Sequence, residues 1–187
     1  NALDMTGNNN GTASGVTYVS GAVGSYAAQF DGTSSYIQIP KSVSTSCSIA
    51  MWVKTTDTGA AGQWWAGKGL VDGEVNGTTH DFGTALNAGK FSIGVGGPDT
   101  TVTSTVAVND GTWHHVVGTW NSTSGAMQVY VDGVLNNSGT GPTGARSSTP
   151  TLRIGSIQTG IAGGFLNGAI DQVQIYNYVL SGAEISS

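Results

Sequence analysis

Two consecutive stretches near the middle of the chain constrain the fold more than any other feature. Residues 113–120 (WHHVVGTW) and 127–135 (MQVYVDGVL) each contain a strand-like run with apolar side chains on both faces. A polar loop, residues 121–125, joins the two runs, and Asp132-Gly133 ends the second. Asp-Gly suits a type I′ hairpin turn because both central residues need positive φ. Such a ribbon is typical of the inner part of a sheet in a layered all-β sandwich.

The composition agrees with this fold class and excludes several functions. Only 9% of the 187 residues are charged and 30 are glycine, as in proteins with many short strands joined by tight turns. Six Lys and Arg residues, with a net charge of −5, provide no basic face for nucleic acid or anionic lipid. No apolar run approaches the roughly 20 residues that cross a bilayer. We expect one domain over residues 1–187, without membrane insertion.

The N-terminus and the single cysteine bear on the cellular compartment. No signal peptide is present, and the abrupt start at Asn1 is consistent with removal of an upstream signal or domain. Cys47 is the only cysteine, so an internal disulfide is excluded. It lies in phase with Ile49 and Met51, which predicts a buried structural thiol rather than a nucleophile. The polar, lysine-poor surface favours a secreted or cell-surface protein.

Strand-like runs recur from end to end, separated by Gly, Asn, Asp and Ser clusters. The expected strands are residues 27–30, 36–39, 47–54, 86–87, 90–95, 102–106, 113–119, 127–131, 151–155 and 168–176. The longest segment without a clear strand is 55–83, which we expect to be functional or to contain short strands. The only helix signal is the capping-box spacing of Ser181 and Glu184, which predicts one turn over residues 182–185.

Several motifs, taken in order, resemble one known family. They are FDG at 30–32 with YIQIP at 36–40, WHHV at 113–116, YVDG at 130–133, LRIG at 152–155 and GAIDQVQIYN at 168–177, followed by AEI at 183–185. This order resembles the bacterial laminin-G-like domains of the concanavalin A-like lectin/glucanase superfamily. The resemblance implies a jelly-roll β-sandwich of two antiparallel sheets. Family members usually have a longer apolar lead-in before the GNNNG loop at 7–11, so part of the first strand is expected to be missing, leaving one sheet edge unpaired.

Asp171 and Asp31 are the candidate metal ligands. Asp171 shares a strand face with Val173 and Ile175, so we expect its carboxylate to point towards the interior, where it needs a cation or several hydrogen bonds. The resemblance implies a structural Ca²⁺ near this strand and the Asp31 loop, held by Asp171 and backbone carbonyls. Hard oxygen ligands suit Ca²⁺. The alternative is a carboxylate that caps backbone amides.

The adjacent Trp64 and Trp65 are candidate ligand-binding residues within a Gly-rich stretch. Exposed aromatic rings stack on the apolar faces of sugars, while nearby polar groups bind the hydroxyls. The alternative is that one or both rings close the end of the sandwich.

An acidic set follows in the same half of the chain: Asp72, Glu74, Asp81 and Asp99, together with His80. Asp72 and Glu74 share a face on an extended backbone, and two carboxylates are what a glycosidase uses. Glucanases of the superfamily carry a third acid at a fixed spacing, which is absent here. We therefore expect ligand hydrogen bonding or a second metal site rather than catalysis. His114 and His115 point to opposite faces of a strand, so they are expected to be packed sheet residues rather than a catalytic or chelating pair.

These observations lead to one functional hypothesis and two alternatives. The resemblance implies a non-catalytic module that binds an extracellular glycan or polysaccharide, within a larger secreted or cell-surface protein with neighbouring domains. The first alternative is a structural or adhesive module with a protein partner. The second is a glycoside hydrolase or polysaccharide lyase.

Overall fold

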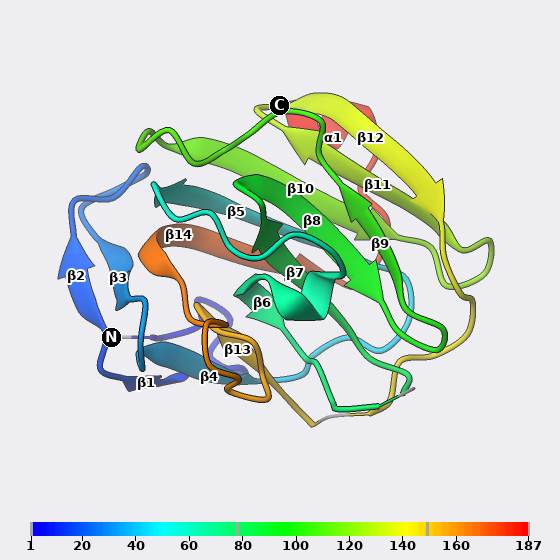
Figure 1. Cartoon of the computed structure of the whole chain (residues 1–187), viewed down its shortest axis with the longest axis horizontal. Helices are drawn as coiled ribbons and strands as arrows, with labels where there is room; N and C mark the ends of the chain where they lie inside the picture. Colours follow the sequence, from blue (N-terminus) through cyan, green and yellow to red (C-terminus); the bar gives the residue numbers. More distant parts are fainter. Residues whose placement is uncertain (1, 78, 149, 187) are drawn as a thin grey trace.

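The protein is an all-β sandwich of two antiparallel seven-stranded sheets packed face to face (Figure 1). This is a computed structural model that describes residues 2–77, 79–148 and 150–186. The first sheet has the order β1 (Thr12–Ser14), β4 (Tyr36–Pro40), β13 (Thr151–Ile154), β6 (Lys68–Asp72), β7 (Phe82–Asn87), β8 (Lys90–Val95) and β9 (Thr100–Thr103). The second has the order β12 (Val134–Thr140), β11 (Ala126–Val131), β10 (His114–Trp120), β5 (Cys47–Thr55), β14 (Asn167–Tyr176), β3 (Ala27–Asp31) and β2 (Thr17–Val19).

The core lies between the sheets because alternate residues of each strand point inward. Ile49, Met51 and Val53 of β5 and Phe91 and Ile93 of β8 belong to one continuous apolar cluster. Cys47 belongs to the same cluster with 1% of its surface exposed. The predicted buried thiol is confirmed. In the described part of the chain, no helix is long and apolar enough to span a membrane.

The central ribbon has the predicted structure. β10 pairs with β5 on one side and with β11 on the other, inside the second sheet. Asp132 and Gly133 connect β11 to β12 with φ values of 51° and 78°, the positive signs that a type I′ turn requires. His114 bonds to Asp132, Nδ1 to Oδ2 at 2.8 Å, whereas His115 packs against Trp52 with ring centroids 5.3 Å apart. The two histidines do not form a pair.

All ten expected strand-like runs overlap a strand, but four strands were not predicted. β6 and the 3-10 helix η1 (Trp64–Ala66) lie inside the segment 55–83, so that segment does contain a hidden strand. β12 is mostly polar, and β1 and β2 have only three residues each. β1 forms one edge of the first sheet, and β2 forms one edge of the second.

The capping box at the C-terminal end of the chain is confirmed. Ser181 Oγ accepts a hydrogen bond from the Glu184 backbone N–H, and the Glu184 carboxylate accepts one from the Ser181 backbone N–H at 2.8 Å. The single helix of this region, α1 (Gly182–Ser186), follows directly. In Figure 1 it lies beside β12.

Candidate functional site

The Trp64 ring packs on two glycines, Gly83 and Gly94, on the outer face of the first sheet; we call this pair the glycine floor. Asp72, Gly83, Gly94 and Thr101 are register partners across β6, β7, β8 and β9, and they face away from the core. A Cβ added to Gly83 would lie 2.6 Å from the Trp64 ring, and one added to Gly94 would overlap it. The ring therefore lies directly on the backbone of these two strands. η1 is the teal turn in front of β6 and β7 in Figure 1.

The position of Trp64 corrects one expectation. Its side chain is fully buried, so its ring is not a surface on which a sugar can stack. The physical reason is the glycine floor, which leaves an indole-sized space that would otherwise be an apolar void. The ring is buried, as the alternative expected, but it lies on the outer face of the first sheet rather than at the end of the sandwich.

Trp65 has the opposite environment and is 37% exposed. Its indole Nε1–H donates to Asp99 Oδ2 at 3.0 Å. Two hydrogen bonds attach the start of η1 to β9. The Trp64 backbone N–H donates to Thr101 Oγ1 at 3.0 Å, and Thr101 Oγ1 donates to Gln63 Oε1 at 2.6 Å. Trp65 and Asp99 thus form an exposed aromatic platform with a carboxylate at its edge.

Gln63 and Thr101 were missed by the sequence analysis. Gln63 was detectable because it directly precedes the tryptophan pair. Thr101 had no local signal, since its role depends on β9 lying next to the loop that contains η1.

Three of the predicted acids are buried behind this platform. Asp72 is 0% exposed, Asp81 2% and Glu74 8%. Asp72 Oδ1 accepts hydrogen bonds from the backbone N–H groups of Glu74 at 2.9 Å and Gln158 at 2.8 Å, and Asp81 Oδ2 accepts one from Val75 at 2.8 Å. The other oxygens, Asp72 Oδ2 and Asp81 Oδ1, are buried and have no hydrogen-bond partner in the part of the chain that the structure describes.

Burial favours the protonated forms of Asp72, Glu74 and Asp99. It raises the pKa of Asp72 to about 7, against the lowering effect of the two backbone hydrogen bonds. Burial, followed by the charges of Asp81 and Asp72, raises the pKa of Glu74 to about 8. Burial also raises the pKa of Asp99, against its hydrogen bond from Trp65.

The nearest guanidinium groups do not neutralise the acids by direct contact. Arg153 stacks on Tyr36 at 4.1 Å, and the buried Arg146 lies 5.1 Å from the Trp120 ring centroid. Among the described residues, neither arginine makes an ion pair with Asp72, Glu74 or Asp81. Asp72 and Glu74 are therefore acids that hold a proton within a buried polar cluster. The buried oxygens Asp72 Oδ2 and Asp81 Oδ1 lie out of reach of a surface-bound sugar.

Asp31 closes the turn between β3 and β4. Its carboxylate accepts backbone N–H bonds from Thr33 at 2.8 Å, Ser34 at 2.8 Å and Ser35 at 3.0 Å. These amide bonds hold the pKa of Asp31 far below its usual range. Its negative charge is thus stabilised by the chain itself.

Asp171 lies on the outer face of the second sheet, which corrects the expected inward direction. It pairs with Trp52, whose neighbours Met51 and Val53 point into the core. The register shifts between Asp171 and Gln174, so the alternation that grouped Asp171 with Val173 and Ile175 is broken there. Gln172 has a φ of 49°.

The Asp171 side chain is nevertheless buried, beneath the loop between β2 and β3. Its Oδ2 accepts the backbone N–H of Val23 at 3.0 Å. A Cβ on Gly21 would lie 2.7 Å from that oxygen and 3.1 Å from the carbonyl oxygen of Val23. Asp171 Oδ1 accepts the backbone N–H of Gln172 at 2.8 Å, so the carboxylate caps two backbone amides, as the alternative expected. A hard cation such as Ca²⁺ would share these oxygens with the amides.

The structure does not bring Asp31 and Asp171 together. Asp31 pairs with Asn167, which lies four residues before Asp171 on β14. At the usual rise per residue of a strand, Asn167 and Asp171 are about 13 Å apart. No three His, Cys, Asp or Glu side chains converge as a metal site within residues 2–77, 79–148 and 150–186. A cation at Asp171 would therefore depend on backbone carbonyls and water, and Asp31 would not share it.

Comparisons with known proteins define the class to which this architecture belongs. A family model described as "Concanavalin A-like lectin/glucanases superfamily", of the laminin-G type, matches residues 31–186. The chain therefore belongs to this superfamily, as its motif order predicted.

Similar proteins of known name or structure were also found. A rat protein, "Sushi, von Willebrand factor type A, EGF and pentraxin domain-containing protein 1", is 39% identical over 93 residues, which is 46% of this chain and 3% of the relative. The chain thus spans only a small part of this curated relative.

Among solved structures, domain 4 of the extracellular arabinanase AbnA from Geobacillus stearothermophilus, in complex with arabinotriose, has a TM-score of 0.77 at 22% identity, covering 99% of this chain and 91% of that one. A pentraxin from Limulus polyphemus has a TM-score of 0.61 at 18% identity, covering 84% and 78%. The botulinum neurotoxin serotype D binding domain has a TM-score of 0.69 at 14% identity, covering 98% and 47%. At these identities the structural likeness establishes the shared fold.

Proposed function

We propose that this domain is a non-catalytic module that binds an extracellular glycan through the Trp65–Asp99 platform. The observation that carries the proposal is the exposed Trp65 ring, oriented by its hydrogen bond to Asp99. A ring of this kind stacks on the apolar face of a sugar, and the free carboxylate oxygen accepts hydrogen bonds from hydroxyl groups. The arabinotriose complex of the structurally similar arabinanase domain supports a sugar as the ligand class.

A non-catalytic role is supported by the burial of the acids. A glycosidase needs two carboxyl groups that reach the scissile bond. Here Asp72 and Asp81 are covered, and both use one oxygen to hold backbone amides. We place the module in a larger extracellular protein beside other domains, as in the multidomain relative from rat.

Calcium is proposed as a structural ligand at Asp171 only. When bound, the ion would supply positive charge to a buried carboxylate and link β14 to the loop before β3. Asp171 and the carbonyl oxygen of Val23 would hold it.

The proposal is tested by glycan-array and affinity-gel binding of the wild type and Trp65→Ala. Tyr178→Ala is the matched control, because Tyr178 is an exposed aromatic residue, at 45%, on another part of the surface. We expect Trp65→Ala to weaken sugar binding about tenfold or more, through loss of the stacked ring, and Tyr178→Ala to leave it unchanged. Equal binding by both variants would contradict the platform. Release of reducing ends that disappears in Glu74→Gln would contradict the non-catalytic role.

The second candidate is an adhesive module with a protein partner. It is favoured by the 39% identity to a segment of a protein with sushi, von Willebrand factor and EGF domains. Absence of any bound sugar on the array, with a pull-down partner retained by Trp65→Ala, would favour this function over the first.

A further inference from the structure

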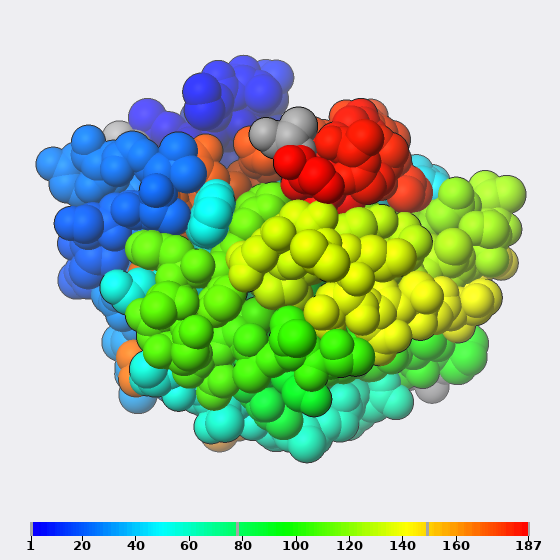
Figure 2. Space-filling view, turned by 90° about the horizontal axis from the view of Figure 1, so that it is seen from above, coloured from blue at the N-terminus to red at the C-terminus, as the bar shows by residue number. Residues whose placement is uncertain are grey.

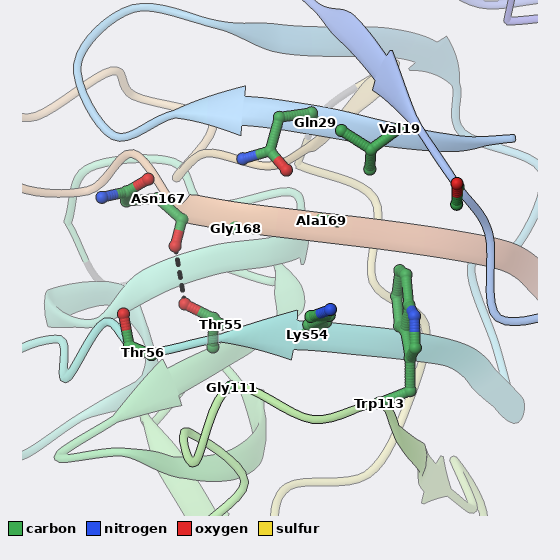
Figure 3. A pocket seen from close by; sticks show the side chains of 11 residues that line it. Val19, Gln29, Lys54, Thr55, Thr56, Gly111, Trp113, Asn167, Gly168 and Ala169 are labelled. Atoms are coloured by element: carbon green, nitrogen blue, oxygen red, sulfur yellow. Dashed lines mark hydrogen bonds between the residues drawn. The ribbon is translucent and has the colours of Figure 1, made fainter.

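A second hollow lies on the other sheet, away from the Trp65 platform. It has a volume of about 480 Å³ and lies on the outer face of the second sheet, where β3, β14 and β5 run side by side (Figure 3). Gln29, Ala169 and Lys54 are register partners across these three strands. Trp113 continues the row, because it directly precedes His114, the partner of Val53.

The hollow exists because the middle member of this row is small. Ala169 contributes only a methyl group between the longer side chains of Gln29 and Lys54. Figure 3 shows Gln29 and Val19 on one side of β14, Lys54 and Thr55 on the other, and the half-buried Trp113 ring standing at one end. In the space-filling view, blue, orange, cyan and green segments lie side by side at the upper left of the molecule (Figure 2).

The charge of the lining is unusual for this protein. Lys54 is the only charged residue that lines the hollow, although the whole chain carries a net charge of −5. Lys54 is exposed and makes no ion pair among the described residues. The nearby Asp57 is already engaged, since its Oδ2 pairs with Lys68 at 3.5 Å and accepts the Asn167 backbone N–H at 3.1 Å. The lining therefore presents one ammonium group, that of Lys54, beside an aromatic wall.

Hydrogen-bonding groups complete the lining. The Thr55 hydroxyl is used internally, because it donates to the Asn167 carbonyl at 2.6 Å. The Asn167 side-chain amide and the Thr56 hydroxyl make no hydrogen bond within the described parts of the chain. Both remain available to a ligand.

We propose that this hollow is a second binding site, for a sugar residue that carries a carboxylate or a sulfate group. The Trp113 ring contacts the apolar face of the sugar, and the Lys54 ammonium binds the acidic group by a charge-assisted hydrogen bond. Gln29 Nε2 already donates to the Phe30 carbonyl at 3.0 Å, so the Gln29 Oε1 and the Asn167 side-chain amide bind the hydroxyls. A volume of about 480 Å³ lies within the usual range for small-ligand sites. The site stands independently of the Trp65 platform, since it is built on the opposite sheet.

The test uses three oligosaccharides with related backbones: tetragalacturonic acid, a sulfated carrageenan tetrasaccharide and neutral galactotetraose. Binding is measured by calorimetry and by the NMR signal of the Trp113 indole N–H. We expect one of the two acidic probes to bind and to shift the Trp113 signal, more strongly than galactotetraose. Which acidic probe binds distinguishes a carboxylate from a sulfate as the recognised group.

Four variants separate the possible sites. Lys54→Gln should weaken acidic-probe binding about tenfold or more, because it removes the cation from an exposed position without disturbing the fold. Trp113→Ala should also weaken it. Lys90→Gln, on β8 of the first sheet, is the matched control, and Trp65→Ala tests the other site; both should leave binding unchanged.

The proposal is overturned if neither acidic probe binds at millimolar concentration, or if Lys54→Gln binds as tightly as Lys90→Gln. Loss of acidic-probe binding in Trp65→Ala alone would assign the ligand to the other platform and also overturn it. Failure of Trp65→Ala to affect neutral glycans, by contrast, would contradict only the proposed function.

Discussion

The ring of Trp64 occupies the space that a side chain at Gly94 would need. Gly83, on the adjacent strand, provides the other half of the floor. Since Trp64 is followed directly by the exposed Trp65, the buried ring also fixes the position of the candidate sugar platform.

Gly94→Ala should therefore destabilise the fold by about 1–3 kcal/mol, because the added methyl group overlaps the indole and forces it to move. Chemical denaturation measures the change, and ligand binding at Trp65 should weaken with it. Gly182→Ala, where the nearest heavy atom to the new methyl group is 4.0 Å away, is the control and should be neutral or slightly stabilising. A stability of Gly94→Ala equal to that of the wild type would disprove the close contact.

The stability should fall as the pH rises from about 4 to about 7. The Asp72 carboxyl titrates near 3.8 when unfolded and near 7 when folded, so the folded state holds its proton through this window. The stabilisation is complete below the unfolded pKa and is lost as the pH rises through the folded pKa. Each unit of separation corresponds to about 1.4 kcal/mol.

Asp72→Asn tests whether the Asp72 carboxyl causes this pH dependence. The variant cannot titrate, but its amide oxygen can still accept the Glu74 and Gln158 backbone hydrogen bonds. Denaturation curves between pH 4 and 8 should show a weaker pH dependence than in the wild type. Glu74→Gln should flatten the curve further towards pH 8. If Asp72→Asn keeps the full slope, another group holds the proton.

Below about pH 4 the pH dependence of stability reverses, so the stability should fall as the pH falls. The hydrogen bonds that lower the pKa of Asp31 stabilise the fold above the unfolded value of 3.8, and this contribution is lost as the pH falls. Asp31→Asn should reduce the acid sensitivity without changing the slope above pH 4. Acid-denaturation midpoints followed by circular dichroism measure it, and an unchanged midpoint would argue against the role of Asp31.

Calcium should raise the Tm relative to EDTA, and the response should depend on Asp171 alone. Asp171→Asn removes the buried negative charge and should abolish the shift, whereas Asp31→Asn should keep it, because Asp31 pairs with Asn167, about 13 Å from Asp171 along β14. Differential scanning calorimetry of the three proteins decides the matter. A Tm that is the same in calcium and EDTA would exclude the proposed structural ion.

Cys47 should not react with thiol reagents in the native protein. Burial raises the pKa of its thiol to about 12, so almost no thiolate is present near neutral pH. Labelling should therefore follow global unfolding and increase with denaturant in parallel with the loss of structure. Rapid labelling without denaturant would show that β5 opens locally.

The sequence alone predicted the fold class, because strand alternation, the Asp-Gly turn and the ordered motifs are all local signals. The β10–β11 ribbon, the buried Cys47 and the Ser181–Glu184 capping box were predicted for this reason. β1, β2 and β12 were missed because they are short or mostly polar, and their strand structure depends on a neighbouring strand.

Tertiary structure alone decided which candidate residues are accessible and which lie together. Trp64 and Trp65 are adjacent and chemically identical, yet only the glycines of β7 and β8 determine that the first is buried. Asp171 faces outward because a bulge resets the alternation, and no local pattern marks that bulge. The row of Gln29, Ala169, Lys54 and Trp113 comes from four separate segments of the chain. Such sites depend on the order of strands in the sheet, which is a long-range property of the chain.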